Sequence, residues 1–298
     1  MRFRDGFCTI IDVTKHSRIL FLGGLFLCGC AAKGLFYFPN SKLYVDPDKI
    51  GIPCELVTYP SVNGKTLYGL YFNAVGDPVG TAVHFHGNAN NVSDHFPLAL
   101  FLRNYGYDVL CFDYQGFGAS EGKPSPANAI DDGLASVRYA QGRMRAPGGG
   151  VVIFAQSVGV AAAAAVAAKE PLVRAAVLEG GFDSFRTITR VTLRRSWVLF
   201  PFSAVVPALT VRRTWDPVNF IAQISPRPLL FIHGTTDRVV PPRLTERLYA
   251  RAEDPKELWL IPGANHLQCH RVAGKQYEKK IDVFFRRALG LGPVATLD

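Results

Sequence analysis

The 298-residue chain has few cysteines with which it can cross-link itself. Six are present, and half of them fall within the first thirty residues. The remaining three are Cys54, Cys111 and Cys269. Three is an odd number, and Cys111 lies inside a predicted strand, so the sequence does not indicate a disulfide framework. A small buried hydrophobic side chain is the simpler role for Cys111.

Several ligand-binding patterns are missing as well. No Cys and His residues have the spacing of metal ligands, and no glycine-rich phosphate loop precedes a predicted helix. The net charge is +9, but the basic residues do not alternate with an aromatic stacking surface of the kind that binds nucleic acid. We therefore expect no cofactor, no metal and no nucleic-acid partner.

The chain is rich in apolar residues, at 48% hydrophobic against 19% charged. This composition supports one large folded domain, and no internal repeat or low-complexity linker divides it. We place this domain at residues 51–290. Residues 30–50 form a tether and lead-in segment, and residues 1–29 form a signal or anchor segment.

Short apolar runs alternate with helical patterns along most of the domain. The predicted strands are residues 55–59, 66–72, 81–85, 108–112, 151–154, 173–178, 229–233 and 257–261. The predicted helices are residues 93–104, 126–141, 158–169, 242–251 and 273–289. Alternation of this kind predicts an α/β fold with a mostly parallel sheet covered by helices on both faces. Residues 182–224 interrupt the rhythm.

A single serine lies between a buried strand and an alanine-rich helix. The strand is residues 151–154, the helix follows at 158–169, and Ser157 sits in the tight turn that joins them. This context is typical of a nucleophile elbow, whose usual spelling is Gly-x-Ser-x-Gly. Here Ala155 replaces the first glycine, which adds one methyl group. The pattern makes Ser157 the candidate nucleophile.

An acid and a histidine follow in the chain, each just after a predicted strand. Asp237 lies in the loop after residues 229–233, and His266 lies in the loop after residues 257–261. Because the carboxyl ends of parallel strands share one edge of a sheet, we expect Ser157, Asp237 and His266 to meet there. His266 would be the general base, and Asp237 would orient its imidazole ring.

Other residues compete for two of these roles. His270 also follows the last strand, although the loop of His266 opens directly from the strand end. Glu179 and Asp183 follow another strand end and are rival acids. Asp237 taken alone could be an ordinary turn residue, since Asp is common in turns.

At this level of detail the chain resembles the α/β hydrolases. It is most similar to the small membrane-tethered serine hydrolases that include the yeast bud-emergence hydrolases and bacterial peptidase-like hydrolases. The resemblance rests on residues 84–91 (HFHGNANN), residues 113–122 (DYQGFGASEG), the Ser157 elbow, and the Asp237 and His266 loops. These segments lie within residues 36–288. The departures are Ala155, and Asn90 where the family usually has glycine.

The resemblance implies an α/β-hydrolase fold, with residues 182–224 as a small helical cap. It also implies an oxyanion hole, which needs two backbone N–H groups aimed at the developing negative charge. One should come from Val158, directly after the nucleophile, and the other from Asn88 in the loop after residues 81–85. His86 would brace this loop, and Tyr114 would line the pocket.

These residues predict a serine hydrolase that cleaves an ester, a thioester or an amide through an acyl-enzyme on Ser157. The apolar cap favours a small ester or an acyl lipid over a long peptide. Two alternatives stay open: a catalytically silent binding protein with the same fold, and a serine-triad acyltransferase. The same triad serves many leaving groups, so the sequence does not separate them.

The N-terminus carries a targeting pattern. Basic residues precede the apolar run 19–27, which is short for a membrane-spanning helix, since such a helix needs about 20 residues. Residues 27–30 (LCGC) resemble a bacterial lipobox, which makes Cys30 a candidate for lipidation. We expect an exported lipoprotein tethered to a membrane surface, with an uncleaved anchor as the alternative.

Arginines are concentrated in the cap. Arg186, Arg190 and Arg194 recur four residues apart, which places them on one face of a helix, and further arginines follow. A solvated helix face is one reading. The other is a surface that faces anionic lipid headgroups or an anionic substrate.

Overall fold

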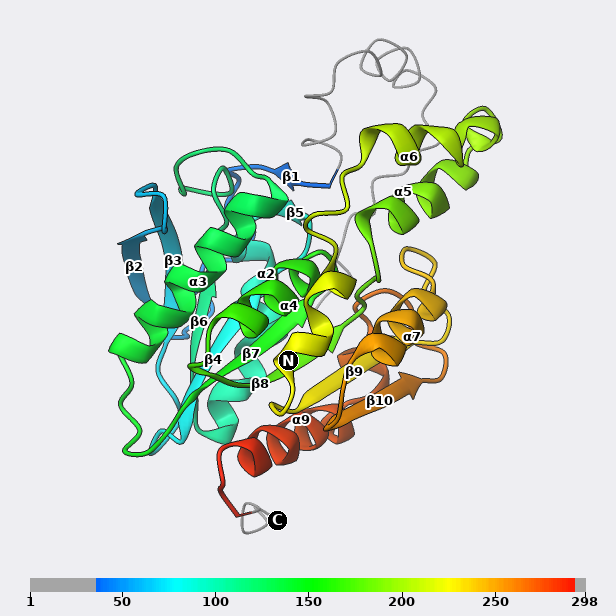
Figure 1. Cartoon of the computed structure of the whole chain (residues 1–298). Helices are drawn as coiled ribbons and strands as arrows, with labels where there is room; N and C mark the ends of the chain where they lie inside the picture. Colours follow the sequence, from blue (N-terminus) through cyan, green and yellow to red (C-terminus); the bar gives the residue numbers. More distant parts are fainter. Residues whose placement is uncertain (1–35, 293–298) are drawn as a thin grey trace.

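The computed structural model describes residues 36–292. At its centre is an eight-stranded sheet in the order β10-β9-β8-β7-β4-β6-β3-β2 (Figure 1). The strands are β2 (Glu55–Pro60), β3 (Thr66–Phe72), β4 (Gly80–Phe85), β6 (Tyr107–Phe112), β7 (Val151–Gln156), β8 (Val173–Glu179), β9 (Leu229–Gly234) and β10 (Lys256–Ile261). Pairings β2–β3 and β3–β6 are antiparallel, and the other neighbouring pairs are parallel.

The burial of each strand agrees with its position in the sheet. Every residue of β4, β6, β7 and β9 is buried, as expected for strands covered on both faces. β2, at the edge, instead alternates between exposed and buried side chains. The predicted α/β fold with a mostly parallel sheet is therefore confirmed.

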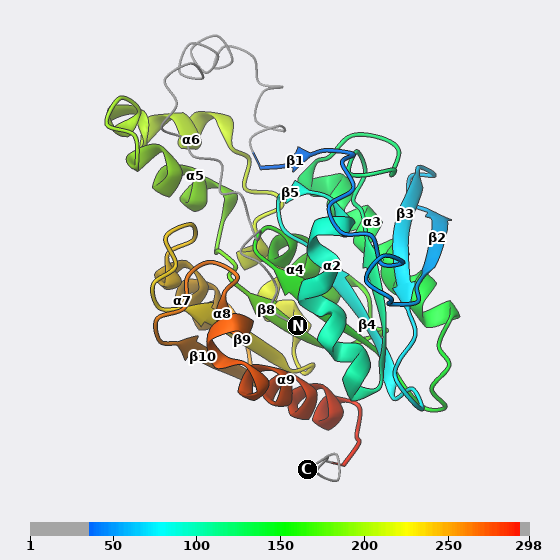
Figure 2. The same ribbon diagram turned by 180° about the vertical axis from the view of Figure 1, so that it is seen from behind.

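Helices cover the two faces of the sheet as two separate layers. One layer contains α3 (Pro126–Gly142), α4 (Gly159–Lys169) and α7 (Pro242–Arg251), which pack into the larger apolar core. The other contains α2 (Val92–Ala99), the 3-10 helix η4 (Leu100–Tyr105) and α9 (Lys275–Ala288), and Figure 2 shows the sheet from that side.

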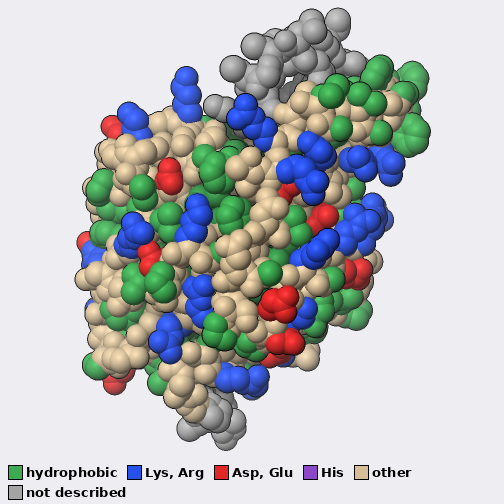
Figure 3. All heavy atoms as spheres, in the orientation of Figure 1, with side chains coloured by type: hydrophobic (Ala, Val, Ile, Leu, Met, Phe, Trp, Pro, Cys, Tyr) green, Lys and Arg blue, Asp and Glu red, His purple; other side chains and the backbone are tan. Residues whose placement is uncertain are grey.

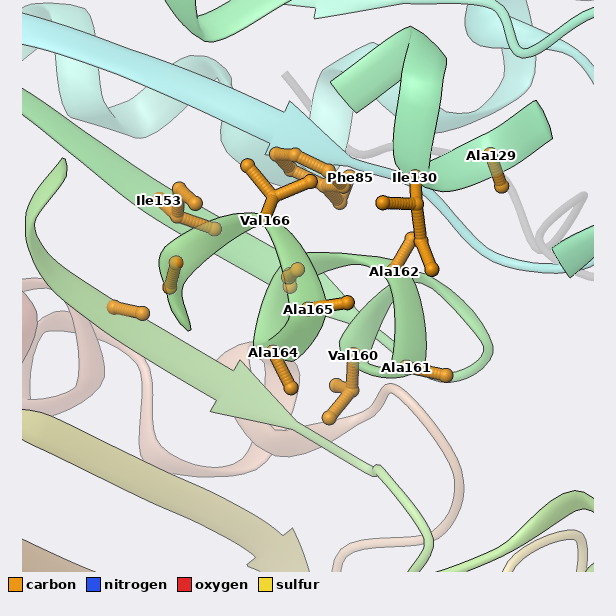
Figure 4. Packing of buried hydrophobic residues seen from close by; sticks show 14 of the residues in the cluster. Phe85, Ala129, Ile130, Ile153, Val160, Ala161, Ala162, Ala164, Ala165 and Val166 are labelled. Atoms are coloured by element: carbon orange, nitrogen blue, oxygen red, sulfur yellow. The ribbon is translucent and has the colours of Figure 1, made fainter. Parts of the chain in front are cut away.

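The alanine-rich helix α4 lies at the centre of the larger core (Figure 4). Its residues 159–167 are all buried. Val166 of α4, Ile130 of α3 and Phe85 of β4 converge there. A Cβ added at Gly133 would collide with the Phe85 ring and lie 2.8 Å from Val166. Small residues therefore let α3, α4 and the sheet approach closely, which fixes the start of α4 beside the end of β4.

The cap follows β8 and projects from the carboxyl edge of the sheet (Figure 1). It contains α5 (Phe185–Arg194), the 3-10 turn η5 (Phe200–Phe202) and α6 (Val205–Thr210). Two further 3-10 turns, η6 (Pro217–Asn219) and η7 (Ile221–Ile224), lead back to β9. Ser184 caps α5 by accepting a hydrogen bond from the Thr187 N–H. These elements fall within the predicted interruption at residues 182–224.

Two expected helices differ from the structure. Residues 93–104 form α2 followed by η4 rather than one continuous helix. The predicted helix 273–289 is α9, which begins at Lys275 and is separated from the short helix α8 (Cys269–Ala273) by Gly274. The φ angle of Gly274 is 53°, a left-handed value that ends a helix.

A short pairing that the sequence did not predict lies beside the site. β1 (Phe38–Pro39) runs parallel to β5 (Ala89–Asn90), and the Phe38 N–H donates to the Asn88 carbonyl at 2.7 Å. Asn90 has a φ of 65°, a left-handed value that glycine adopts freely and that Asn tolerates better than most residues. Its side chain accepts from Tyr44 at 2.8 Å and donates to Asp94 at 2.7 Å. Asn90 therefore keeps the turn and adds contacts that glycine lacks.

Candidate active site

Ser157 occupies a strained turn between β7 and α4. Its φ is 55°, a left-handed value that non-glycine residues rarely adopt. The Ser157 N–H donates to the Glu179 carbonyl of β8 at 2.9 Å, which holds the turn in place. A Cβ at Gly159 would collide with the Phe85 carbonyl and lie 2.7 Å from the His86 carbonyl, so only glycine fits there. This is the geometry of a nucleophile elbow.

Ala155 does not disturb this turn. It is a fully buried residue of β7, and it pairs with Phe85 on one side and Leu178 on the other. The position therefore lies in regular strand, before the turn begins. The positive φ values of the elbow fall on Ser157 itself, and the extra methyl group joins the core.

The structure brings the three predicted residues together. His266 Nε2 lies 3.0 Å from Ser157 Oγ, and His266 Nδ1 lies 2.7 Å from Asp237 Oδ2. Asp237 is almost completely buried, whereas the His266 side chain keeps 12% of its surface exposed. Residues that follow β7, β9 and β10 thus form one hydrogen-bonded line at the carboxyl edge of the sheet.

The Asp237 carboxylate is held from several sides. Its Oδ1 accepts from the backbone N–H groups of Val239 at 2.7 Å and Val240 at 2.8 Å. Its Oδ2 lies 3.1 Å from Nε2 of the buried His233. Burial alone would raise the pKa of Asp237, but the hydrogen bonds from His233 and His266 hold it well below its usual range. The residue therefore stays ionised at neutral pH and favours a proton on His266 Nδ1.

Two residues that the sequence did not single out position the histidine. Asn265 Oδ1 accepts from the Arg238 N–H at 2.9 Å and from the His266 N–H at 2.8 Å, so it links the acid loop to the histidine loop. Gly180, with a φ of 65°, lies under the His266 ring, and a Cβ there would be 3.4 Å from it. The Gly-Ala-Asn-His order after the last strand was the available signal for Asn265, but its partners are distant in sequence.

The predicted oxyanion loop lies directly beside the serine. A Cβ at Gly87 would lie 3.8 Å from Ser157 Cβ, and Asn88 follows it. Val158 precedes the first residue of α4, so its N–H belongs to the amino end of that helix. Asn88 and Val158 thus both lie in segments next to Ser157, and their role as oxyanion-hole donors stays a prediction.

Aromatic and imidazole rings support the oxyanion loop. His86 is buried, its Nδ1 hydrogen-bonds the Gly87 carbonyl at 2.8 Å, and its ring stacks on His95 at 5.0 Å. Tyr114 Oη donates to the His86 carbonyl at 3.2 Å, and Tyr114 is 1% exposed. Tyr114 was expected to line the pocket. It instead braces the loop from inside the core, because its hydroxyl reaches a backbone carbonyl there.

The structure leaves the rival residues outside this line. His270 Nε2 pairs with Glu278 Oε1 at 2.9 Å, and its ring stacks on Tyr277. The Glu179 carboxylate accepts from Gln156 at 2.7 Å and from Tyr277 at 2.8 Å, within the core.

Asp183 and Cys269 also lie outside the hydrogen-bonded line of Asp237, His266 and Ser157. Asp183 lies at the start of the cap, just before α5, and its side chain accepts a hydrogen bond from the Thr187 hydroxyl at 3.5 Å. Burial raises the pKa of the Cys269 thiol, which keeps it protonated and unreactive at neutral pH.

The described part of the chain, residues 36–292, contains no group of three or more His, Cys, Asp or Glu residues arranged to hold a metal ion. None of the helices within it is long and apolar enough to cross a membrane. The predicted targeting segment at residues 1–29, and Cys30, lie outside the described residues.

Comparisons with known proteins agree with this geometry. A family model described as serine aminopeptidase, S33, matches residues 76–222, which include Ser157 and end before Asp237. The chain is 34% identical over 249 residues to the uncharacterized protein YfhR of Escherichia coli K12, covering 82% of this chain and 83% of that protein. It is 28% identical over 295 residues to the alpha/beta hydrolase domain-containing protein WAV2 of Arabidopsis thaliana, covering 90% and 93%.

A solved structure shares the fold. The Pyrococcus furiosus esterase Pf2001 superposes with a TM-score of 0.70 at 18% identity, covering 85% of this chain and 98% of that one. The fold, the elbow and the sequence relatives together show that the chain belongs to the α/β-hydrolase superfamily. Within that superfamily it is a serine-hydrolase-type protein, similar to YfhR over most of both chains.

Proposed function

We propose that this protein cleaves an ester, a thioester or an amide through an acyl-enzyme formed on Ser157. The observation that supports the proposal is the hydrogen-bonded line from Asp237 through His266 to Ser157 Oγ, with distances of 2.7 and 3.0 Å. A serine hydroxyl is a weak nucleophile until a neighbouring base accepts its proton, and His266 Nε2 is within reach to do so.

In the first half of the reaction, Ser157 Oγ attacks the carbonyl carbon of the substrate and its proton passes to His266 Nε2. The carbonyl oxygen takes up the negative charge, and the N–H groups of Val158 and Asn88 donate to it. Collapse of this intermediate breaks the bond to the leaving group, which takes the proton from His266. Asp237 stabilises the imidazolium while the proton resides there.

In the second half, water replaces the leaving group. His266 accepts a proton from the water as the water attacks the acyl carbon, and then returns it to Ser157 Oγ. The products are the free acid and the original enzyme. If another alcohol, thiol or amine replaced the water, the same steps would give acyl transfer.

The cap supports a small ester or an acyl lipid as the substrate, in preference to a long peptide. It lies at the carboxyl edge of the sheet, and Arg195 of the cap donates to the Val239 carbonyl in the acid loop at 2.8 Å. A long peptide would need an open groove at this edge. The names of the related proteins include both an aminopeptidase family and an esterase, so the leaving group is a matter for assay.

A fluorophosphonate probe tests the proposal, because labelling requires an activated serine. We expect the wild-type protein to be labelled and the Ser157→Ala variant to remain unlabelled. A folded wild-type protein that resists the probe would favour a catalytically silent binding protein. A panel of p-nitrophenyl esters, acyl thioesters and aminoacyl anilides then ranks the leaving groups, and added acceptor alcohols reveal any acyltransferase activity.

We also propose that the N-terminus tethers the enzyme to a membrane surface through lipidated Cys30. Stable anchoring needs two or more acyl chains, because one gives only marginal binding. Membrane association should then resist high salt and disappear in Cys30→Ala, with activity on soluble esters retained. An intact mass that begins at Met1, with membrane binding retained in Cys30→Ala, would instead point to an uncleaved anchor that contains the apolar run 19–27.

A further inference from the structure

The tip of the cap, defined here as residues 194–212, exposes large apolar side chains. Trp197 is 89% exposed and Leu209 is 81% exposed. Four more exposed apolar residues belong to the same stretch: Val198, Phe200, Phe202 and Val205. Figure 3 shows hydrophobic side chains gathered at the far end of the cap. Single exposed apolar residues are ordinary on a protein surface, but a cluster of this kind marks an interaction site.

The stability of the cap does not require this tip to be apolar. The side of α5 that faces the hydrolase domain carries Phe185, Thr189 and Leu193, which are all buried. Phe185 packs edge-on against Phe182 at 5.2 Å. These residues join the cap to the domain, whereas Trp197 and Leu209 keep most of their surface in solvent. The exposed cluster is therefore free to contact a partner.

The charge around the tip has only one sign. Residues 184–215 contain six arginines and no Asp, Glu or Lys, and Figure 3 shows Lys and Arg side chains next to the apolar tip. Arg194 and Arg212 are exposed, and neither side chain has a hydrogen bond or ion pair within residues 36–292. The partner must therefore be negatively charged as well as apolar. A second copy of this cap fails that requirement, because arginines would face arginines.

Two contacts fix where the tip lies. Phe36, the first described residue, packs against Phe185 with ring centroids 4.8 Å apart. The described chain therefore begins beside the base of the cap. At the other end of α5, Arg195 reaches the Val239 carbonyl next to Asp237. The tip, the start of the described chain and the site thus share one side of the molecule.

We propose that the tip of the cap docks onto an anionic lipid bilayer. Trp197, Phe200, Phe202 and Leu209 would enter the interface between headgroups and acyl chains, with the arginines at the level of the phosphates. Aromatic and aliphatic residues ringed by arginine are the composition of surfaces that lie in this interface. Docking would turn the carboxyl edge of the sheet toward the bilayer, which deepens the proposed function by offering acyl lipids as substrates. The docking itself rests on the surface alone.

Fluorescence of Trp197 tests the docking in the full-length chain. The chain has three tryptophans, so the Trp215→Phe/Trp259→Phe variant leaves Trp197 as the only one. With vesicles that contain brominated phosphatidylglycerol, we expect a blue shift of the emission and strong quenching. Vesicles of brominated phosphatidylcholine alone should give little of either. If the double variant does not fold, the spectrum of Ser157→Ala minus that of Ser157→Ala/Trp197→Phe reports the same residue.

The fluorescence measurement separates docking of the cap from the two earlier proposals, which are catalysis by Ser157 and tethering through Cys30. Every sample carries Ser157→Ala, so the result does not depend on turnover. A chain held on the vesicle by its N-terminus still shows whether the cap inserts. Trp197 that stays unquenched on such a vesicle overturns the proposal. So does equal quenching in the two lipids, or a Trp197→Glu change that alters self-association in light scattering while leaving vesicle binding intact.

A matched pair of arginine variants tests the charge. Arg194→Gln/Arg212→Gln removes two cap arginines, and each should weaken docking to phosphatidylglycerol roughly fivefold. Arg174→Gln/Arg251→Gln removes the same charge from two exposed sites outside the cap and should leave docking nearly unchanged. High salt should weaken docking of the wild type more than that of the cap variant. Equal loss in both variants would mean that net charge, and not the cap, attracts the lipid.

Discussion

The loops that carry the proposed triad (Ser157, His266 and Asp237) and the tip of the cap lie on the same side of the molecule but are built in opposite ways. Both carboxylate oxygens of Asp237 have partners, through Val239, Val240, His233 and His266. Trp197 at the tip is 89% exposed, and Arg194 beside it is an exposed, unpaired charge within the described residues.

This difference indicates two kinds of task. A catalytic group must be held in one geometry by its neighbours, since a small displacement lowers the rate strongly. A surface that binds a fluid bilayer depends on its apolar area and its charge more than on fixed contacts between individual atoms. Substitutions in the triad loops should therefore change chemistry, and those at the tip should leave both chemistry and stability almost unchanged.

The largest effect is expected at the nucleophile and its base. Ser157→Ala and His266→Ala should each lower kcat on a soluble ester by about 10⁶ while the protein stays folded. His270→Ala, the matched control, should keep most of the activity, because His270 pairs with Glu278 outside the triad. Steady-state assays with circular dichroism as the folding check decide this. If His270→Ala were the inactive variant, the base would have to be reassigned.

The acid should have the next largest effect. Asp237→Asn should lower kcat by about 10⁴, because an amide favours the wrong tautomer of His266. In the wild type the pKa of Asp237 is held well below its usual range, so its ionisation should not limit the rate above about pH 4. A near-wild-type rate for the Asn variant would return the acid role to Glu179 or Asp183.

The two sides of the cap should respond differently to truncation. Phe185→Ala removes a 2%-exposed ring and should lower the unfolding free energy by about 3 kcal/mol or more. Trp197→Ala removes an 89%-exposed ring and should change it by less than about 0.5 kcal/mol. Urea unfolding of both variants measures the difference. A large loss of stability in Trp197→Ala would show that the tip packs against the protein itself.

Asp216, at the base of the cap, should make the stability of the protein depend on pH. Burial raises the pKa of Asp216 to about 6, against opposing contributions from the Phe185 N–H and Arg213. The folded state then binds more protons than the unfolded state between about pH 4 and pH 6, so stability falls as pH rises through that window.

Asp216→Asn removes this titration and keeps an oxygen for the Phe185 N–H. Relative to wild type, the variant should gain stability between about pH 4 and pH 7, by at most about 3 kcal/mol. Unfolding of both proteins in urea at about pH 4 and about pH 7 measures the gain. A difference that does not vary with pH would mean that Asp216 is already ionised at the lower value.

An effect smaller than that of Asp216→Asn is expected at Ala155, the departure from the usual elbow spelling. Ala155→Gly restores that spelling but places glycine inside β7, which should cost about 0.5–1 kcal/mol of stability. Activity should stay close to wild type, because the left-handed turn begins at Ser157 and not before it. A marked gain in kcat would show that the methyl group distorts the elbow.

Much of the site was predictable because local pattern decided it. Buried strands such as β7 and β9 read as short apolar runs, and the residues directly after them had to reach one sheet edge. The partners that hold these residues were not predictable. His233, Asn265 and Gly180 act through contacts between loops that are far apart in the sequence. No local pattern encodes such contacts.

The sequence by itself determined the α/β order of strands and helices, the elbow at Ser157, and the candidate acid and base. It did so because hydrophobic periodicity and turn chemistry act over a few residues. Only the tertiary structure decided that His266 and not His270 faces Ser157, that Tyr114 supports a loop, and that β1 pairs with β5. Those outcomes depend on which segments pack together, and packing is a property of the whole fold.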